Sequence, residues 1–599
     1  DPGPWAFHAL SLYGRRQGQV EWETDRARFI GRGRTTAAPD AVTLRQPLSR
    51  TVGTVLDPVF ALRRRVRIPP GTVARLAFWT IVAPTREALI DLVDKHHDRS
   101  AFDRARTLAW TQGQVQLRYL DMDGSEAADF QRLASPLLYA DPRFRAPPAT
   151  IQRGGGPQSA LWPLSISGDL PIVLLRIDHL EDIDRVRQAL RAHEYWRIRR
   201  VAVDLVIVNE HSSSYIQDLA QAIDAAVRSS QTRPRFGREL AEGVVHVLRA
   251  DLLTLEQREL LAGLARVVLV ARRGPIADQL DLLPPPRAVP QATPVRSPTT
   301  HGFRPPVPAL EFFNGIGGFD QDGTEYVTVL DDAATTPAPW INVISNGGFG
   351  FHVSADGSGY SWSENSRENQ ITAWSNDPVC DPPGEAFYIR DDFTGECWSP
   401  TAQPIRDGGR YLARHGFGYS RFMHQANGIA ADLLQFVPLA DPVKVSRLTL
   451  TNRSDRPRRL TVVYYVEWTL GIGRGANGPH IVTEAHSATG ALLGRNPFGL
   501  AFPGRVAFAD LGGSLVDFTC DRTEFLGRGG MASPAGLAFG ARAQQEVGHV
   551  HHRLPAEDGR LRGRDPGRDG QRRRAARTAG ERGDPVVPQA RVRIAGAGP

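Results

Sequence analysis

Residues 459–470 alternate with a period of two between an apolar face and a more polar one, which carries Arg459, Thr461, Val463, Tyr465, Glu467 and Thr469. The side chains on one face of the predicted strand are Leu460, Val462, Tyr464, Val466, Trp468 and Leu470. A sustained period of two predicts an antiparallel β-strand with one face on a core. We expect this strand to form a hairpin with 444–452 across the turn at 453–457. Many similar strands separated by Gly-rich turns predict an antiparallel β super-sandwich over 311–540.

Short, continuous apolar runs dominate the stretch between residues 160 and 275. They lie at 171–177, 201–208, 244–250 and 266–271. Helical spacing is present between these runs. Strands that are apolar on both faces and alternate with helices are typical of a mostly parallel sheet. We therefore expect an α/β segment over 151–275.

The N-terminal residues 1–84 have the pattern of β-strands. Strand-like runs lie at 51–56, 64–68 and 73–82, with a turn at Pro69–Gly71. From residue 85 the apolar spacing becomes helical, and Thr85 is placed to cap the first helix. We expect 85–150 to be a helical connector.

An internal repeat relates the two β-rich parts. Residues 20–34 (VEWETDRARFIGRGR) align with 516–530 (VDFTCDRTEFLGRGG), sharing V, D, R, F, G, R and G in order. The chain thus opens inside one copy of a domain and closes near the end of a second. We interpret 1–84 as the C-terminal part of a first β-sandwich. The repeat predicts the same strand–turn–strand path at both places, and a helix at either would contradict it.

Two regions differ in composition from a folded core. Residues 276–310 are rich in proline, which predicts a stiff linker between domains. Residues 541–599 contain 13 Arg but no Lys, Phe, Tyr or Trp. A disordered basic tail is one interpretation. We favour the other, a shift of reading frame, because the repeat requires closing strands here to cover sheet edges.

Charge and cysteine content exclude several classes of partner. In 541–599, 13 Arg against 7 acidic residues give +6, which leaves about +1 of the total +7 for the other 540 residues. A nearly neutral body gives no reason to expect nucleic acid. No run approaches the roughly 18 apolar residues that span a bilayer. We interpret the chain, which begins at Asp1 rather than Met, as a fragment or processed product without a direct membrane span.

No metal or cofactor is expected either. The three cysteines lack metal-ligand spacing. His549, His551 and His552 lie in the tail without a fourth ligand. Asp121 and Asp123 have the spacing of an Asp-x-Asp metal and nucleotide-sugar motif. Because no strand flanks them, we interpret them as a solvated loop.

Aromatic and planar polar residues gather between 360 and 377. The candidate substrate-binding residues are Tyr360, Trp362, Asn365, Arg367, Asn369, Trp374 and Asn376. Aromatic faces stack on the apolar faces of pyranose rings, and amide or guanidinium groups bond their hydroxyls. We expect Trp362, Arg367 and Asn369 to line a shared groove for a β-linked glucan. The structural alternative is that Trp362 and Trp374 pack in the core while Asn365 and Asn369 cap turns.

Long motifs over 1–540 resemble cyclic β-1,2-glucan synthases, which contain the N-terminal sandwich of the glycoside hydrolase family 94 phosphorylases (formerly glycosyltransferase family 36). The motifs are PWINV at 339–343, GYSW at 359–362, NSREN at 365–369, WSNDP at 374–378, RHG at 414–416 and YSR at 419–421. The first half resembles the preceding sandwich and the α/β joining segment of the same synthases. The resemblance does not extend into 541–599.

The resemblance implies a function for the longer protein. Such synthases make cyclic glucan from UDP-glucose with a membrane-embedded glycosyltransferase region, and their C-terminal module is phosphorylase-like. Catalysis in that module uses an acidic residue on an (α/α)6 barrel, which would follow the second sandwich. We therefore name no catalytic residue and expect this fragment to be inactive alone.

Partners and location follow from the same resemblance. We expect a carbohydrate-binding, non-catalytic fragment that binds a β-linked glucan or oligosaccharide and forms a homodimer through the sandwich. It would lie on the cytoplasmic side, with its parent protein in the inner membrane. The alternative is an active glycoside phosphorylase or transglycosylase with its site within 100–275.

Overall fold

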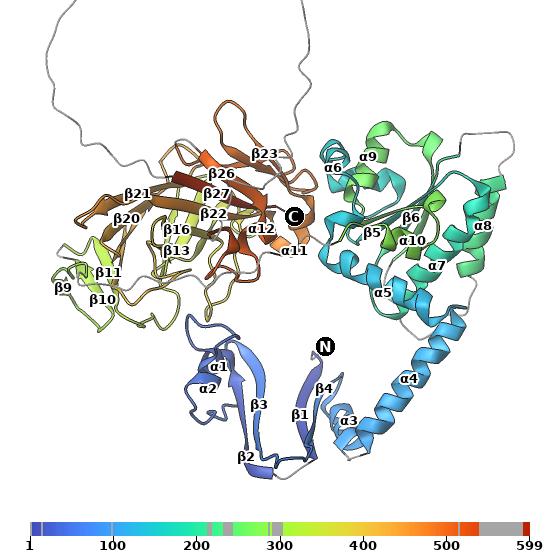
Figure 1. Ribbon diagram of the computed structural model, residues 1–599, viewed down its shortest axis with the longest axis horizontal. Coiled ribbons are helices and arrows are strands. Elements are labelled where there is room, and N and C mark those ends of the chain that lie inside the picture. Colours follow the sequence, from blue (N-terminus) through green and yellow to red (C-terminus); the bar gives the residue numbers. More distant parts are fainter. Residues whose placement is uncertain are drawn as a thin grey trace, which may run out of the picture.

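A computed structural model describes residues 3–13, 16–97, 100–211, 218–231, 243–285, 288–289, 304–320, 322–512, 515–537 and 591–598. The chain runs from N-terminal strand ladders through a helical arm and an α/β unit to a large sandwich (Figure 1). The fold is mainly antiparallel β with an α/β segment, as predicted.

Antiparallel ladders form the N-terminal part. Strand β1 (Trp5–Tyr13) pairs with β4 (Arg75–Ala83), and β2 (Arg16–Asp25) pairs with β3 (Pro58–Val66). Two of the predicted strands overlap β3 and β4. The strand predicted at 51–56 is wrong, because this segment is irregular and its Thr51 carbonyl accepts a hydrogen bond from a side chain rather than from a neighbouring strand.

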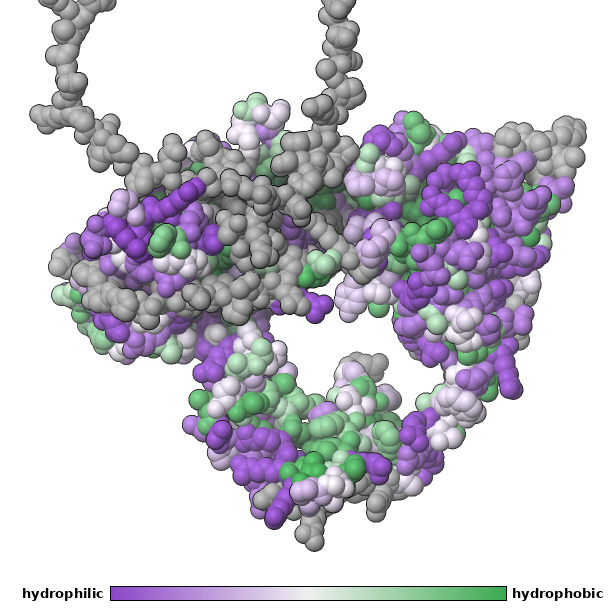
Figure 2. Space-filling model, viewed as in Figure 1, coloured by the Kyte–Doolittle hydropathy of each residue, from purple (hydrophilic) through white to green (hydrophobic). Residues whose placement is uncertain are grey.

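Apolar side chains on these ladders lack a covering layer. Phe60 is 56% exposed, and Phe78 and Val82 are each 59% exposed. Figure 2 shows hydrophobic residues gathered over this part of the molecule. Strands of a sandwich bury such a face against a second sheet. The assignment of 1–84 to a first sandwich therefore stays a prediction. The exposed apolar face is consistent with it, because a second sheet could pack on that face.

The helical connector contains α3 (Arg86–His97), α4 (Ala101–Tyr119) and α5 (Gly124–Tyr139). The predicted cap is confirmed, since the Thr85 hydroxyl accepts a hydrogen bond from the Ala88 amide at 3.2 Å. Such a bond satisfies one of the free N–H groups in the first turn of a helix.

The α/β unit has the predicted parallel sheet. Its strands lie in the order β7 (Val245–Arg249), β6 (Asp204–Asn209), β5 (Ile172–Ile177) and β8 (Val267–Val270). The accompanying helices are α6 (Pro148–Arg153), α7 (Ile183–Ile198), α8 (Asp218–Gln231) and α9 (Leu255–Leu264). Alternate residues of β5 enter separate cores, with Val173 in one and Ile172 in the other. Both faces of the sheet are thus covered, which explains the continuous apolar runs.

The α/β unit extends beyond the boundary predicted at residue 275. Helix α10 (Ile276–Asp281) buries Ile276 and Leu280 in the core that β5 and α7 share. The start of the predicted linker at 276 is therefore wrong, because two apolar residues in the first turns of α10 anchor it. Most of the Pro-rich stretch, residues 290–303, lies outside the described residues.

The second β-rich part is a sandwich of facing sheets, as predicted for 311–540. One sheet runs β21 (Val445–Asn452), β20 (Ile429–Phe436), β19 (Tyr419–Ala426), β18 (Tyr411–Gly416), β11 (Glu325–Leu330), β10 (Gly317–Asp320) and β9 (Leu310–Glu311). The other runs β12 (Ile341–Ser345), β13 (Phe349–Ser354), β14 (Gly359–Ser363), β15 (Gln370–Thr372), β22 (Leu460–Gly471), β16 (Glu385–Asp391) and β17 (Cys397–Trp398). Phe351 and Phe387 of the second sheet meet Phe422 and Leu433 of the first in a shared core.

The predicted hairpin of 444–452 with 459–470 is wrong. Strand β21 pairs with β20 in one sheet, whereas β22 pairs with β15 and β16 in the other. The chain therefore crosses between the sheets at 453–459. Strand β22 is also buried on both faces for most of its length, not on one. The more polar face of β22 carries Thr and Tyr, and these residue types can also be buried in a central strand, so the pattern did not distinguish one-sided from two-sided burial.

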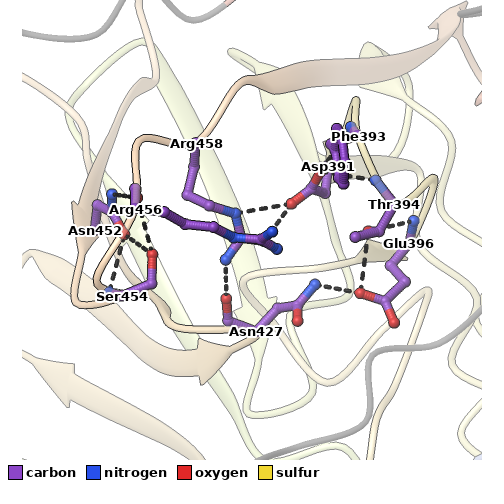
Figure 3. Close-up of polar contacts among 9 residues, drawn as sticks. All are labelled: Asp391, Phe393, Thr394, Glu396, Asn427, Asn452, Ser454, Arg456 and Arg458. Atoms are coloured by element: carbon purple, nitrogen blue, oxygen red, sulfur yellow. Dashed lines mark hydrogen bonds and ion pairs between the residues drawn. The ribbon is translucent and has the colours of Figure 1, made fainter.

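A buried ion pair ties this crossing to the neighbouring turns (Figure 3). The Arg458 guanidinium donates to Asp391 at the end of β16 and to the Asn427 carbonyl in the turn between β19 and β20. The Asn427 amide in turn donates to Glu396. The side chains of Arg458 and Asp391 are only 6% and 1% exposed. The Arg458 guanidinium thus links three chain segments at one end of the sandwich: the crossing at 453–459, the end of β16 and the turn between β19 and β20.

An added ladder joins the sandwich to the α/β unit. It consists of β23 (Val482–Ala485), β24 (Leu492–Arg495) and β25 (Val506–Ala509). The loop after β24 carries Phe498, whose carbonyl accepts a hydrogen bond from the Gln158 amide at 3.1 Å. The Phe498 ring also packs against the core behind Leu161 of the α/β unit.

Each copy of the repeat is a strand followed by a short helix. Helix α1 (Arg26–Ile30) follows β2, and α12 (Arg522–Leu526) follows β26 (Leu515–Asp521). Asp25 and Asp521 cap these helices, and a glycine with positive φ follows each. The predicted strand–turn–strand path is wrong at both places, because an Asp before a helical turn acts as an N-cap. The copies instead share a strand, an Asp cap and a short helix.

The tail is described only at 591–598. There β27 (Arg591–Gly598) pairs in parallel with β22 and β26. The rest of 541–599 lies outside the described residues, so disorder and a frameshift both stay predictions. Among the described helices, none has the length and hydrophobicity needed to cross a membrane.

Candidate functional site

An aromatic cluster lies on the face of β13 and β14 opposite the core. Tyr360 and Trp362 alternate along β14, and cross-strand pairing places His352 opposite Tyr360. Ring centroids are 5.2 Å apart for Tyr360 and Trp362 and 4.7 Å apart for Tyr360 and His352. The intervening Phe351 and Val353 enter the sandwich core. The period of two in these strands therefore separates a packing face from an aromatic outer face.

Trp374 completes this cluster from the segment after β15. Its ring lies parallel to that of Tyr360, with centroids 5.1 Å apart and an interplanar angle of 12°. Tyr360 is only 4% exposed, whereas Trp374 is 43% exposed. One side of the Trp374 indole is thus fixed on a rigid aromatic base, and its accessible part is offered to solvent. Packing of Trp374 in the core, the structural alternative, is wrong.

Trp362 is held by a close approach to the neighbouring strand. A Cβ atom on Gly350, its cross-strand partner, would lie 2.7 Å from the Trp362 indole. Any larger residue at 350 would displace the indole. Trp362 is partly exposed and belongs to the outer face.

The polar candidates in the turn between β14 and β15 mainly serve the backbone. The Asn365 side-chain oxygen accepts hydrogen bonds from the amides of Arg367 and Glu368, each at 2.9 Å. Asn369 is 3% exposed and donates to the Ser363 carbonyl at 3.0 Å. The predicted shared groove of Trp362, Arg367 and Asn369 is therefore wrong for Asn369, which caps the turn from inside. The Arg367 side chain is 88% exposed.

A buried acidic group lies beneath the cluster. Glu385 accepts hydrogen bonds from Ser361 at 2.6 Å and Thr372 at 2.8 Å, and pairs with Lys444 at 2.9 Å. Burial pushes the pKa of Glu385 up, but Lys444 and the hydroxyl donors outweigh it and hold the pKa below its usual value. The Lys444 ammonium also lies 4.2 Å from the Phe351 ring centre. These charges fix β14 and β15 from the core side.

His352 is neutral within the cluster. Burial lowers the pKa of its imidazole below the usual value. Burial likewise raises the pKa of Tyr360, whose hydroxyl donates to the Ser366 carbonyl at 3.2 Å. The outer face therefore offers uncharged rings near neutral pH, which suits stacking on a neutral ring better than attraction of an ion.

The last candidate, Asn376, begins a segment that the N-terminal part holds. Asn376 is exposed with φ +48°. Its neighbour Asp377 forms a two-point ion pair with Arg26, at 2.8 and 2.7 Å. Sequence reasoning missed this contact, since the two residues are 351 positions apart. The only available signal was the recurrence of Arg in both copies of the repeat.

Comparison with known protein families gives one match, in two stretches of the chain. The profile of the glycosyl hydrolase 94 supersandwich domain matches residues 1–99 and 324–557, more than half of the chain. The chain belongs to this family. Each matched stretch of the supersandwich contains one copy of the repeat.

Relatives of this supersandwich chain act on sugars, as their names state. It is 39% identical over 562 residues to the cyclic beta-(1,2)-glucan synthase NdvB of Rhizobium meliloti, covering 90% of this chain and 20% of that protein. It is 36% identical over 156 residues to the N,N'-diacetylchitobiose phosphorylase of Vibrio furnissii, covering 26% and 19%. It is 34% identical over 167 residues to the solabiose phosphorylase of Paenibacillus borealis, covering 26% and 20%. The chain thus spans about a fifth of the length of these relatives.

The helical connector of the supersandwich chain carries an acidic hollow. This hollow of about 620 Å³ is lined by Asp121, Asp123, Glu126 and Asp129, among others. Glu126 pairs with Arg191 at 2.6 Å. A hydrogen bond from the Glu126 amide holds the pKa of Asp123 below its usual value. Across the described part of the chain, no three His, Cys, Asp or Glu side chains are grouped to hold a metal ion.

Proposed function

We propose that this region binds a β-linked glucan on the Tyr360–Trp362–Trp374 cluster and supplies no catalytic residue of its own. The observation that carries the proposal is the parallel stack of Trp374 on Tyr360, which leaves the outer indole 43% exposed. The similarity to NdvB supports a cyclic β-1,2-glucan as the sugar. The longer protein would then make that glucan from UDP-glucose.

Sugar stacking fits this geometry for a physical reason. A pyranose ring presents C–H groups on its flat faces, and an indole fixed from behind loses little conformational freedom when a sugar covers it. The exposed side chains of Arg367, Asn365 and Asn376 lie on the turns that follow, where they could donate to hydroxyl groups. Loops on a rigid sheet are common positions for such recognition.

Location and assembly extend the proposal. By the resemblance to the synthases, the longer protein would lie in the inner membrane, with this region on its cytoplasmic side. The resemblance to family 94 phosphorylases also implies that loops of the sandwich help to form sugar subsites across a dimer. A homodimer through the sandwich would therefore place the cluster beside a catalytic module.

Replacing Trp374 by Ala is expected to weaken binding of β-1,2-linked gluco-oligosaccharides by about 1–2 kcal/mol, or roughly 5- to 30-fold in Kd. Trp362→Ala should also weaken binding, because its indole supports Tyr360 at 5.2 Å. Isothermal titration calorimetry measures both. Trp110→Ala is the matched control, since Trp110 is 68% exposed on α4 and outside the cluster. Equal affinity of the Trp374 variant and the parent chain would contradict the proposal.

The alternative, a phosphorylase site within 100–275, lacks support from the acidic hollow. Inverting phosphorolysis needs a protonated carboxylic acid beside the glycosidic oxygen. In the hollow, Glu126 is paired with Arg191 and the lowered pKa of Asp123 keeps that group ionised.

We expect the chain, incubated with β-1,2-glucan and phosphate, to release no glucose 1-phosphate above background. A coupled assay for glucose 1-phosphate measures this, with a family 94 phosphorylase and its own substrate as the positive control. Sustained release, lost when an acidic residue within 1–540 is replaced, would support the alternative instead.

A further inference from the structure

Two arginines of the first repeat copy reach across to the sandwich. Arg26 pairs with Asp377, at 2.8 and 2.7 Å. Arg32 donates to Asp356 at 2.8 Å and to Asp381 at 3.3 Å. In Figure 1 the end of the N-terminal part that carries α1 approaches the sandwich. Both arginines therefore contact the ends of the segment that follows Trp374.

Backbone contacts align the same two parts. The Gly33 amide donates to the Val379 carbonyl at 2.8 Å, and Arg32 donates to that carbonyl at 3.3 Å. Gly33 has φ +73°, so this turn needs a residue that tolerates a left-handed conformation. The N-terminal part thus engages 377–381 by main chain and side chain together.

These ion pairs are shielded from water. The side chains of Arg32 and Asp356 are 11% and 3% exposed, and those of Arg26 and Asp377 are 24% and 20% exposed. Burial raises the pKa of Asp356, and Arg32 opposes that rise. Hydrogen bonds from Arg26 are the main cause that lowers the pKa of Asp377. Pairs this shielded, with two-point geometry, hold an orientation that surface pairs do not.

The segment they hold is the one that carries the outer ring of the cluster. Asp377 follows Trp374 by three residues, and its carboxylate accepts hydrogen bonds from the amides of Val379 and Cys380, each at 3.0 Å. Asp381 accepts a further bond from Ser354 at the end of β13. The path of 374–381 is therefore set at Asp377 by Arg26 and at Asp381 by Arg32.

The second repeat copy shows that the repeat motif does not by itself require its arginines to contact a distant loop. Arg522, the counterpart of Arg26, pairs at 3.1 Å with Glu467 of the strand β22 in its own sandwich. Arg528, the counterpart of Arg32, is exposed. Arg522 thus binds a strand of its own sandwich, whereas Arg26 binds Asp57 of its own part and also Asp377 of a distant loop.

We propose that Arg26 and Arg32 are positioning residues that hold segment 374–381, and with it the Trp374 indole, in the geometry that binds the glucan. This inference rests on the proposed function. It makes the sugar surface a composite one, in which the first repeat copy supplies no contact to the sugar but sets the place of its outer ring. The ligand of this composite surface is the same β-linked glucan that the proposed function names.

The test replaces Arg26 by Met and follows two independent readouts. Hydrogen exchange of 374–381 should become faster, and the Kd for β-1,2-linked gluco-oligosaccharides should rise roughly threefold to tenfold. Arg28→Met is the matched control, because Arg28 lies on the same helix with a side chain 60% exposed, and it contacts Asp25 and Thr51 of the N-terminal part rather than the sandwich. It should change neither readout.

A double-variant comparison separates the ion pair from a general loss of stability. Asp377→Asn keeps an oxygen that can accept from the Val379 and Cys380 amides but removes the charge that Arg26 binds, so it should change both readouts as Arg26→Met does. Arg26→Met combined with Asp377→Asn should then lose little more than either single variant. Fully additive losses in the double variant, or unchanged exchange of 374–381 in Arg26→Met, would overturn the inference. If Trp374→Ala leaves affinity unchanged, the proposed function fails, and the exchange readout still decides whether the arginines hold the segment.

Discussion

Replacing Arg458 by Met is expected to lower the free energy of unfolding of the sandwich by about 3–5 kcal/mol near neutral pH. The change leaves the Asp391 carboxylate, whose side chain is 1% exposed, without its partner. It also removes the donor to the Asn427 carbonyl, so the connections drawn in Figure 3 lose their common anchor. Urea-dependent hydrogen exchange of β16 and β22 measures the loss.

The effect of this variant should depend on pH in a defined direction. Burial raises the pKa of Asp391, but hydrogen bonds from Arg458 and from the amides of Phe393 and Thr394 outweigh this effect. The pKa of Asp391 therefore lies below its usual value. The pair therefore stabilises the fold above the unfolded-state pKa, and this contribution is lost as pH falls through the folded-state pKa. The difference between variant and parent should shrink in acid.

Arg459→Met is the matched control for this prediction. Arg459 is the next residue along the chain, but its side chain is 60% exposed and lies 3.7 Å from Asp392. Such a surface pair contributes about 0–1 kcal/mol. Comparable losses in the Arg458 and Arg459 variants would mean that the buried pair has no special role.

Replacing Lys444 by Met is expected to cost a similar amount, about 3–5 kcal/mol near neutral pH. Glu385 would keep hydrogen bonds from Ser361 and Thr372 but lose the charge that keeps it ionised inside the sandwich. Its pKa should therefore rise above the usual value, since burial is then opposed only by neutral donors. The loss of stability should again diminish as pH falls and Glu385 becomes protonated.

A second substitution distinguishes charge from packing in this case. Adding Glu385→Gln to Lys444→Met removes the unpaired carboxylate and should recover part of the stability. Lys95→Met is the control, because Lys95, the other lysine in the chain, is exposed on α3. Thermal unfolding monitored by tryptophan fluorescence compares the three variants. A double variant no more stable than Lys444→Met would show that Lys444 acts through packing alone.

The pattern of the sequence predicts elements better than their partners. The α/β sheet is predicted correctly because each of its strands is apolar on both faces, as β5 with its two cores requires. For β21 and β22 the alternation identifies strands but not pairing. Two strands joined by a short connection can pair with each other or enter facing sheets, and only the packing of Phe351 against Phe422 selects the second arrangement.

In the candidate site too, contacts within neighbouring strands could be predicted from the sequence, whereas contacts set by the tertiary fold could not. Tyr360, Trp362 and Trp374 come together because they lie on or beside one strand, which the sequence displays directly. Asn369 differs, since its amide has a backbone carbonyl within reach and a buried turn needs that donor more than a groove does. The contact of Arg26 with Asp377 joins distant parts of the chain and is fixed only by the tertiary fold.

The contacts of Arg26 and Phe498 bring the N-terminal part, the sandwich and the α/β unit into a closed ring of contacts. One contact joins the N-terminal part to the sandwich, and the other joins the sandwich to the α/β unit, which already follows the N-terminal part through α4. Each closure raises the effective concentration at which the other forms. A single cut in the Pro-rich stretch would thus leave the pieces associated, and a load applied at one junction would be shared with the other.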